Sequence, residues 1–161
     1  MFRRKKRGPH PEISRPVALE VNYDKPKWRI INSDDYLYVM YGLGVDRFPI
    51  KGKGVGKASF VRITLDRDYP CEQIISLINE QGFNLPDRPE SETYMDALSE
   101  SKAKLALSPV VAFCGTPTKF IGKQQDYPYV EINENGITIA AVCSSREFLK
   151  GTRILAIVSR E

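Results

Sequence analysis

Histidine is almost absent from this sequence, since His10 is the only one among 161 residues. A single histidine excludes the Cys–His pairs and Ser–His–Asp triads in which an imidazole activates the nucleophile. Cysteine is scarce as well. Cys71, Cys114 and Cys143 lie too far apart in the chain to supply the paired ligands of a common zinc site. We therefore expect neither a bound metal nor a cofactor.

Disulfide frameworks and membrane-spanning segments are also missing. Three cysteines cannot all pair, and each lies in an apolar run, where a free thiol packs as a small hydrophobe. No apolar stretch approaches the ~18 residues of a membrane span. The charged residues 1–7 have no apolar segment behind them that would make a secretory signal. These absences predict a cytoplasmic or nuclear protein without a membrane partner.

Positive charge is concentrated in the first part of the chain, although the net charge is only +4. Residues 1–62 hold 14 Lys and Arg against 6 Asp and Glu, whereas residues 66–100 hold nine acids and two bases. Such an asymmetry is typical of a protein whose basic part meets a polyanion. It fits self-association between opposite faces equally well. Solvated charge without any partner is the third interpretation.

The N-terminal end carries an uninterrupted basic run, and Pro9, Pro11 and Pro16 follow it. Adjacent like charges repel and prolines prevent a helix, so residues 1–16 are predicted to form a flexible arm. Such a run binds nucleic acid, serves as a nuclear address, reaches into a partner assembly or keeps the protein soluble. Residues 17–161 contain no obvious linker and are predicted to form a single domain. The basic run at the N-terminal end consists of Arg3, Arg4, Lys5, Lys6 and Arg7.

Strand patterns dominate the rest of the first half. Apolar and polar side chains alternate, or aromatic and β-branched ones cluster, in segments separated by turns. We expect strands at 17–23, 28–31, 36–41 and 58–65, with 42–57 as a loop. Together they predict a β-meander that is most simply antiparallel.

Two helices are predicted in the middle of the chain. The first has one apolar stripe, with Pro70 in its first turn and Gly82 as its stop. The second is expected from Ser91, as the N-cap, to about residue 107, with Tyr94 and Leu98 among its inward side chains. The stripe of the first helix consists of Cys71, Ile74, Ile75 and Ile78.

The C-terminal part returns to strands, with nearly continuous apolar runs at 110–114, 137–143 and 154–158. Residues 129–132 should pair with the second of these runs across a turn that ends at Gly136. Residues 144–147 have the form of a capping box and predict one or two helical turns. The chain is therefore predicted to be an α+β protein with a mostly antiparallel sheet, compatible with a barrel. Two helices separate its N-terminal meander from its C-terminal strands.

Glycines and lysines alternate between Lys51 and Lys57. This segment is no nucleotide-binding loop, because such a loop needs glycine at position 51 and a hydroxyl at Ala58. A flexible turn is the simpler interpretation. The alternative is a basic loop whose glycines let the backbone approach a phosphate while Lys51, Lys53 and Lys57 neutralise it.

Aromatic and basic residues are interleaved between residues 25 and 47. Proteins hold single-stranded nucleic acid by stacking its bases on aromatic rings and neutralising its phosphates. The same aromatic side chains would also suit a hydrophobic core. The candidate binding residues of this region are Lys27, Trp28, Arg29, Tyr36 and Tyr38.

Carboxylates cluster at Asp66, Asp68 and Glu72. Paired carboxylates can hold Mg²⁺ for phosphodiester hydrolysis. Their simpler role is to end a strand and to favour the N-terminus of the helix that follows.

The function predicted from these features is non-catalytic nucleic-acid binding, to single strands or without sequence preference. The arm and a basic, aromatic sheet surface would provide the contacts. The alternative is a structural or adaptor protein that assembles with protein partners, or with its own copies, through the arm and the acidic segment 66–100. A Mg²⁺-dependent phosphodiesterase using Asp66 and Asp68 is the third possibility.

Overall fold

The computed structural model describes residues 11–24, 38–39, 47–50, 52–119 and 125–161. Three helices are found there, α1 (Cys71–Glu80), α2 (Arg88–Ala97) and α3 (Lys102–Leu107). The strands are β1 (Glu12–Ile13), β2 (Val17–Asn22), β3 (Tyr38–Val39), β4 (Val55–Thr64), β5 (Tyr69–Pro70), β6 (Val110–Ala112), β7 (Thr118–Lys119), β8 (Gln125–Asn133), β9 (Gly136–Cys143), β10 (Glu147–Phe148) and β11 (Arg153–Arg160).

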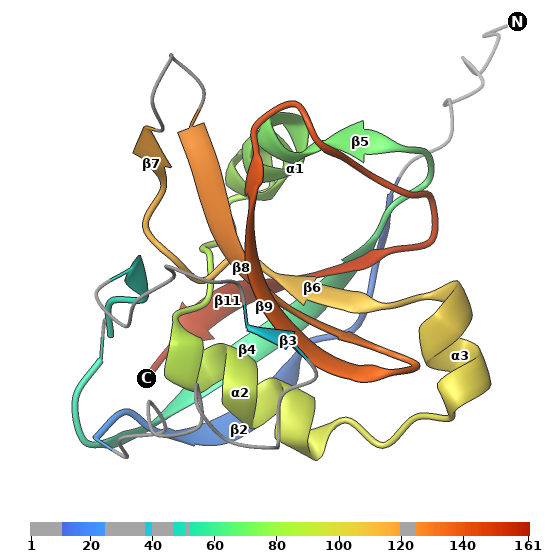
Figure 1. Ribbon diagram of the computed structural model, residues 1–161. Coiled ribbons are helices and arrows are strands. Elements are labelled where there is room, and N and C mark those ends of the chain that lie inside the picture. The colour runs from blue at the N-terminus through green and yellow to red at the C-terminus, as the bar shows by residue number, and fades with distance from the viewer. Residues whose placement is uncertain (1–10, 25–37, 40–46, 51, 120–124) are drawn as a thin grey trace, which may run out of the picture.

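Nine of the strands form one curved sheet, in the order β1-β4-β11-β6-β8-β9-β3, with β2 beside β4 and β7 beside β8 (Figure 1). Within the described residues, its pairings are antiparallel except β6 with β11 and β3 with β9. A separate antiparallel pair joins β5 to β10. The predicted α+β class with a mostly antiparallel sheet is therefore confirmed, and the sheet is not a closed barrel.

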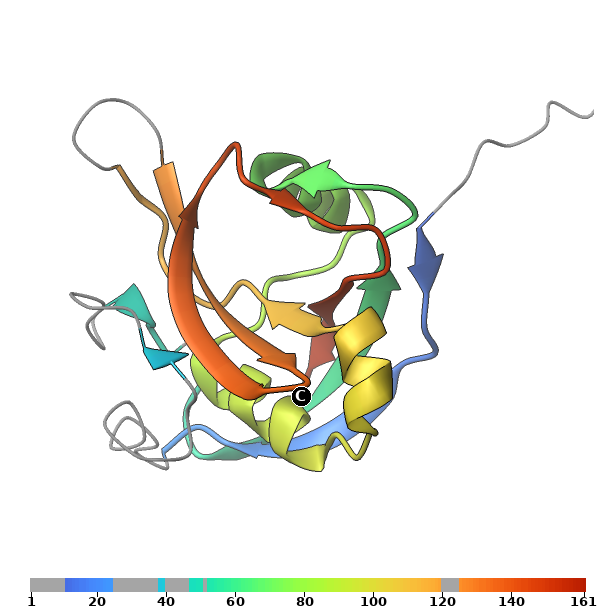
Figure 2. The same cartoon turned by 45° about the vertical axis from the view of Figure 1, so that its right-hand side comes forward.

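Both faces of the sheet are covered, because side chains that alternate along each strand point to opposite faces. On β4, Phe60 faces α2, and its ring lies 5.4 Å from that of Tyr94. Ile63 of the same strand faces α1 and packs in a second cluster with Ile74. Figure 2 shows α1 on one side of the sheet, and α2 and α3 on the other. Burying each such side chain stabilises the fold by about 1.5–3 kcal/mol.

The N-terminal meander was predicted wrongly. β2 pairs directly with β4 in antiparallel register, from Val17 opposite Phe60 to Asn22 opposite Val55. The segment predicted as a strand at 36–41 is described only as β3, which pairs with β9 instead. The strand predicted at 28–31 lies outside the described residues. Contacts this far apart in the chain leave no local sequence signal.

The folded domain was predicted to begin at residue 17, after an arm of residues 1–16, but the first strand of the sheet lies before that position. Strand β1 pairs with β4, placing Glu12 opposite Thr64. Ser14 then donates its backbone N–H to the carbonyl of Arg62 at 2.9 Å, and its Oγ accepts from the backbone N–H of Arg62 at 2.8 Å. Residues 12–14 are therefore fixed to the sheet.

Helix α1 follows the predicted stripe, with Cys71, Ile74 and Ile78 buried, and Gly82 after it has a φ of +75°. Pro70 was misplaced, since it is the extended N-cap residue and not part of the first turn. The predicted second helix is two helices. Asp87 caps the first in a capping box with Glu90, and Ser101 caps the second. The predicted cap, Ser91, is buried inside α2, where its hydroxyl donates to the carbonyl of Asp87.

The three C-terminal runs form β6, β9 and β11, and the β8–β9 turn ends at Gly136 as predicted. The helical turns predicted at 144–147 are wrong. The carbonyls of Ser144 and Arg146 accept the backbone N–H groups of Glu72 and Cys71, the first two residues of α1. These N–H groups have no partner within their own helix. The segment thus completes the start of α1.

Candidate nucleic-acid interface

Lys53 and Lys57 are the predicted binding residues whose side chains the structure describes, and both are exposed. Tyr38 is described as a backbone position on β3. The remaining predicted residues lie outside the described ranges: Arg3, Arg4, Lys5, Lys6, Arg7, Lys27, Trp28, Arg29, Tyr36 and Lys51.

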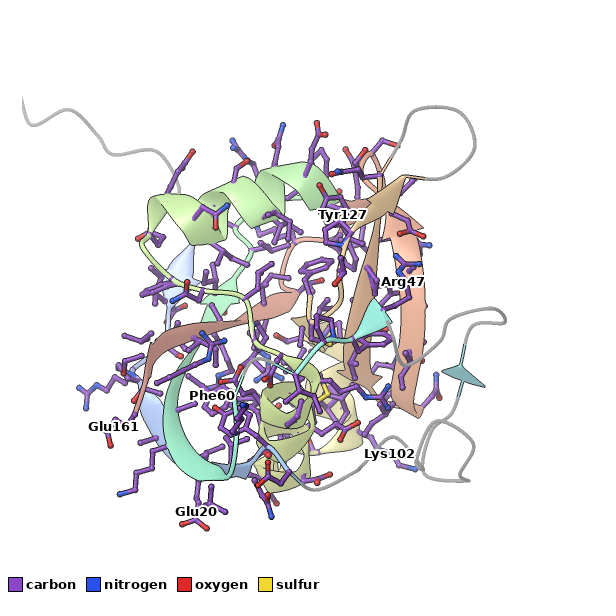
Figure 3. All side chains as sticks on the ribbon, turned by 90° about the vertical axis from the view of Figure 1, so that its left-hand side faces the viewer. Glu20, Arg47, Phe60, Lys102, Tyr127 and Glu161 are labelled. Atoms are coloured by element: carbon purple, nitrogen blue, oxygen red, sulfur yellow. The ribbon has the colours of Figure 1, made fainter. Side chains whose placement is uncertain are left out.

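A loop was predicted for residues 42–57, but β4 already begins at Val55, so Lys57 lies on that strand. Its Cα is opposite that of Glu20 on β2, and its carbonyl accepts the backbone N–H of Glu161 at 2.8 Å. Glu20 and Glu161 project from the same side of the molecule (Figure 3). The backbone of Lys57 therefore lies beside two residues that carry carboxylate side chains.

The glycines beside these lysines have structural roles. A Cβ on Gly52 would lie 2.7 Å from the ring of Tyr23, so only glycine lets the chain pass that ring. Gly54 has a φ of +64°, which favours glycine, and its N–H donates to Oδ1 of Asp24 at 2.9 Å. Packing on Tyr23 thus accounts for glycine at these positions without a bound phosphate.

A buried carboxylate, Glu90, connects three elements. Its oxygens accept from the hydroxyl of Tyr23, the residue after β2, at 2.9 Å, and from Nε and Nη2 of Arg160 on β11 at 2.8 and 2.9 Å. The backbone N–H of Asp87 donates to it at 2.8 Å. Burial alone would raise the pKa of Glu90, but these donors hold it below its ordinary value. No local pattern in the sequence indicated this network, because its members are up to 137 positions apart in numbering, from Tyr23 to Arg160.

A second carboxylate, Glu100, lies among three cations. Arg153 donates from Nη1 at 2.7 Å and from Nη2 at 2.5 Å. Arg62 and Lys104 approach to 3.3 and 3.4 Å. The hydrogen bonds from Arg153 lower the pKa of Glu100 to about 2. The described acids of segment 66–100 are therefore largely engaged within the protein.

The other acids of this segment support the same conclusion. Asp66 accepts from the hydroxyl of Tyr69 at 2.7 Å, and Asp68 accepts from the backbone N–H of Lys150 at 2.7 Å. Glu92 pairs with Arg88 at 2.6 Å. Most acids of the segment thus have partners within the protein, whereas Glu72 and Glu80 are exposed on α1.

The carboxylates proposed for Mg²⁺ do not form a metal site. Among the residues that the structure describes, no group of three or more His, Cys, Asp or Glu side chains could hold a metal ion. Asp66 and Asp68 take part in the hydrogen bonds above, and Glu72 is exposed on α1.

Two hollows are present in the described part of the molecule. One, of about 260 Å³, lies over α1, where the guanidinium of Arg67 stacks 4.8 Å from the centre of the Tyr69 ring. The other, of about 190 Å³, lies beside Cys114 and is lined largely by apolar residues, among them Pro49, Pro86 and Phe113. In the first, the hydroxyl of Ser76 donates to the backbone carbonyl of Glu72 at 3.1 Å, and in the second, burial raises the pKa of the Cys114 thiol, so neither presents an activated nucleophile.

The distribution of charge between the described part and the rest was not foreseen. The described part holds 14 Lys and Arg against 17 Asp and Glu, a net charge of −3. The residues outside it hold ten against three, a net charge of +7. A basic surface on the folded sheet, as predicted from the sequence, therefore has little support from the described residues.

Cys143 is exposed, although all three cysteines were predicted to be buried. The Ser145 hydroxyl, 3.4 Å from its Sγ, lowers the pKa of this thiol, whereas burial raises the pKa of Cys71 and of Cys114 to about 12. We expect one thiol per chain to react rapidly with a thiol reagent and two to react only after unfolding. Mass mapping of the labelled residue tests this, and Cys143→Ser should abolish the rapid phase. Rapid labelling of Cys71 or Cys114 in native protein would contradict it.

In the part of the chain that the structure describes, no helix is both long and apolar enough to cross a membrane. Comparisons with protein-family models, with curated proteins and with solved structures give no match for this chain.

Proposed function

We propose that this protein binds nucleic acid without catalysis, to single strands or without sequence preference, through the basic residues of its N-terminal end. The observation that supports this best is the separation of charge. Five adjacent cations, residues 3–7, precede a described part with a net charge of −3. Such a run neutralises phosphates and releases counterions, which is the main source of sequence-independent affinity. We place the protein in the cytoplasm or nucleus, where such ligands occur.

The position of β1 supports a contact at one end of the sheet. The pairing of Glu12 with Thr64 fixes the chain just after the basic run at one end of β4. Lys53 precedes the opposite end of that strand, which begins at Val55. Nine residue steps at about 3.3 Å each separate the two ends by about 30 Å. The point where the chain enters the sheet and Lys53 therefore lie near opposite ends of β4, and we assign the main contact to the basic run.

Deleting residues 1–10 tests this assignment. If the five cations neutralise about five phosphates, affinity for a labelled single strand should fall with salt at a log–log slope near −3.5. The truncated protein should bind weakly with a nearly flat slope, because its described part repels a polyanion. Fluorescence anisotropy across 50–200 mM salt measures both slopes, and duplex DNA and RNA in parallel establish the preferred form.

The matched control is the double variant Lys53→Glu, Lys57→Glu, which also removes positive charge but at the far end of β4. It should keep most of the slope. If it flattens the slope as much as the truncation does, the main contact is not at the basic run. If wild-type protein binds no oligonucleotide at low salt, nucleic-acid binding is wrong. Assembly with a protein partner through the same run then becomes the favoured function.

A further inference from the structure

Two leucine side chains at one end of the molecule protrude into solvent. Leu107, the last residue of α3, is 82% exposed, and Leu149, between β10 and β11, is 68% exposed. Leu105 of the same helix is buried and fixes α3 to the core. Single exposed leucines are normal, but neighbouring ones mark a contact surface.

The two leucines lie on segments that touch. The hydroxyl of Ser108 donates to the carbonyl of Gly151 at 2.7 Å, and the backbone N–H of Arg153 donates to the carbonyl of Pro109 at 2.8 Å. A Cβ on Gly151 would lie 3.2 Å from the carbonyl oxygen of Leu107. The end of α3 and the turn before β11 therefore form one continuous surface, seen at the right of Figure 1.

The surface is basic as well as apolar. Residues 101–109 and 148–152 contain three lysines and no acid. Three acids adjoin this surface: Glu100 is engaged by Arg153 and Lys104, Asp68 accepts from the backbone N–H of Lys150 at 2.7 Å, and Glu147 is exposed before Leu149. With Arg153 included, positive charge remains in excess. We call this surface the leucine patch and define it by Leu107, Leu149, Lys102, Lys104 and Lys150, all of which are exposed.

Strand β1, which begins five positions after the basic run of residues 3–7, lies at the same end of the sheet. Thr64 pairs with Glu12 on one side and with Arg153 on the other, so β1 and the start of β11 flank the same point of β4. Figure 2 likewise shows β1, α3 and the turn before β11 at the same end of the sheet. The leucine patch and β1, the first described strand after the basic run, therefore share one end of the molecule.

We propose that the leucine patch docks on an anionic lipid surface, with Leu107 and Leu149 inserted between the lipids and the lysines at the headgroups. A side chain that is 82% exposed lies in no groove, so it suits a deformable layer that closes around it. Leucine and lysine on one surface are typical of interfacial segments. Stable docking takes two signals, and the basic run supplies the second.

Nucleic acid is a poorer ligand for this patch, because leucine side chains do not stack on bases and its phosphates cannot cover them. The sequence predicted no membrane partner because it has no spanning segment. Docking on the surface of a lipid layer does not require a spanning segment.

The test is sedimentation of the full-length protein with vesicles of phosphatidylcholine alone or with about 30% phosphatidylserine, where anionic lipid gives the surface potential that attracts lysine. We expect binding to the anionic vesicles only. The double variant Leu107→Ser, Leu149→Ser should lose about 10-fold or more of this affinity per leucine. Val55→Ser is the matched control, since Val55 is 61% exposed at the opposite end of β4. It should bind as wild type does.

Two results would overturn the proposal. One is an absence of wild-type binding to anionic vesicles, and the other is full binding by the leucine double variant, which would leave only the basic run as the attraction. If light scattering shows a wild-type oligomer that the double variant dissociates, the patch is a protein interface instead. Oligonucleotide binding by the double variant should match wild type, so this test and that of nucleic-acid binding fail independently.

Discussion

Replacing Glu90 by alanine should lower the free energy of unfolding by about 2–5 kcal/mol, because it leaves two buried donors, the hydroxyl of Tyr23 and the N–H of Asp87, without an acceptor and Arg160 without its partner. Glu90 is fully buried and accepts from Tyr23 and from two nitrogens of Arg160. Its loss would free the end of β11 from α2 and would remove the N3 half of the α2 capping box. A domain of this size is typically stable by 5–15 kcal/mol, so the variant should be close to unfolding. Urea titration followed by circular dichroism measures the effect.

Milder substitutions separate the charge from the hydrogen bonds. Tyr23→Phe removes one donor and should cost about 0.5–1.5 kcal/mol, or up to 3 because the acceptor is charged. Glu134→Ala, at an exposed position in the β8–β9 turn, is the matched loss of a carboxylate and should cost less than about 0.5 kcal/mol. If Glu90→Ala costs no more than Glu134→Ala, the buried network does not stabilise this fold.

Local patterns predicted the elements whose stabilising contacts are local or whose faces are both apolar. The α1 stripe from Cys71 to Ile78 is one example, and the apolar runs of β6 and β11 are others. The start of α2 was missed despite a local signal. Asp87 and Glu90 have capping-box spacing and Pro89 lies in the first turn, but Ser91 was given the role instead.

Non-local pairing accounts for most of the remaining errors. Residues 144–147 have the local form of a helix start, yet their carbonyls are used by the first N–H groups of α1. Strand β3 pairs with β9, about a hundred residues later, and β1 pairs with β4. A sequence pattern indicates that a strand has an apolar face, but not which strand lies beside it.

Prediction of the candidate site was also limited by contacts between residues that are far apart in the chain. Counting charges found the acidic segment and the basic run, but it could not find which charges are already paired. Glu90 and Glu100 meet Arg160 and Arg153, which lie more than fifty residues later. After these pairs are removed, the unbroken run at residues 3–7 is the feature of the sequence that still favours a polyanion.

Acid should destabilise this protein partly through Glu100. Its pKa of about 2 in the folded protein, held there by Arg153, lies below the ordinary value of about 4.3 for an unfolded chain. A carboxyl with a lowered folded-state pKa contributes stability that is fully present above the unfolded value and is lost as the pH falls towards the folded one. We expect the contribution of Glu100 to disappear between about pH 4.3 and 2.

The variant Glu100→Gln isolates this contribution, because it keeps the shape of the side chain but cannot ionise. At pH 7 it should be less stable than wild type by about 3–5 kcal/mol, since Arg153 is left buried without its counter-ion. The difference should shrink as the pH falls from about 4.3, because wild-type Glu100 then becomes protonated and neutral as well. Glu90 also has a lowered pKa, so the variant should retain some acid sensitivity. Glu134→Gln is the exposed control and should follow wild type at every pH. Urea unfolding at intervals from pH 7 to 2.5 measures these differences, and a Glu100→Gln deficit that stays constant over that range would show that this carboxyl keeps an ordinary pKa in the fold.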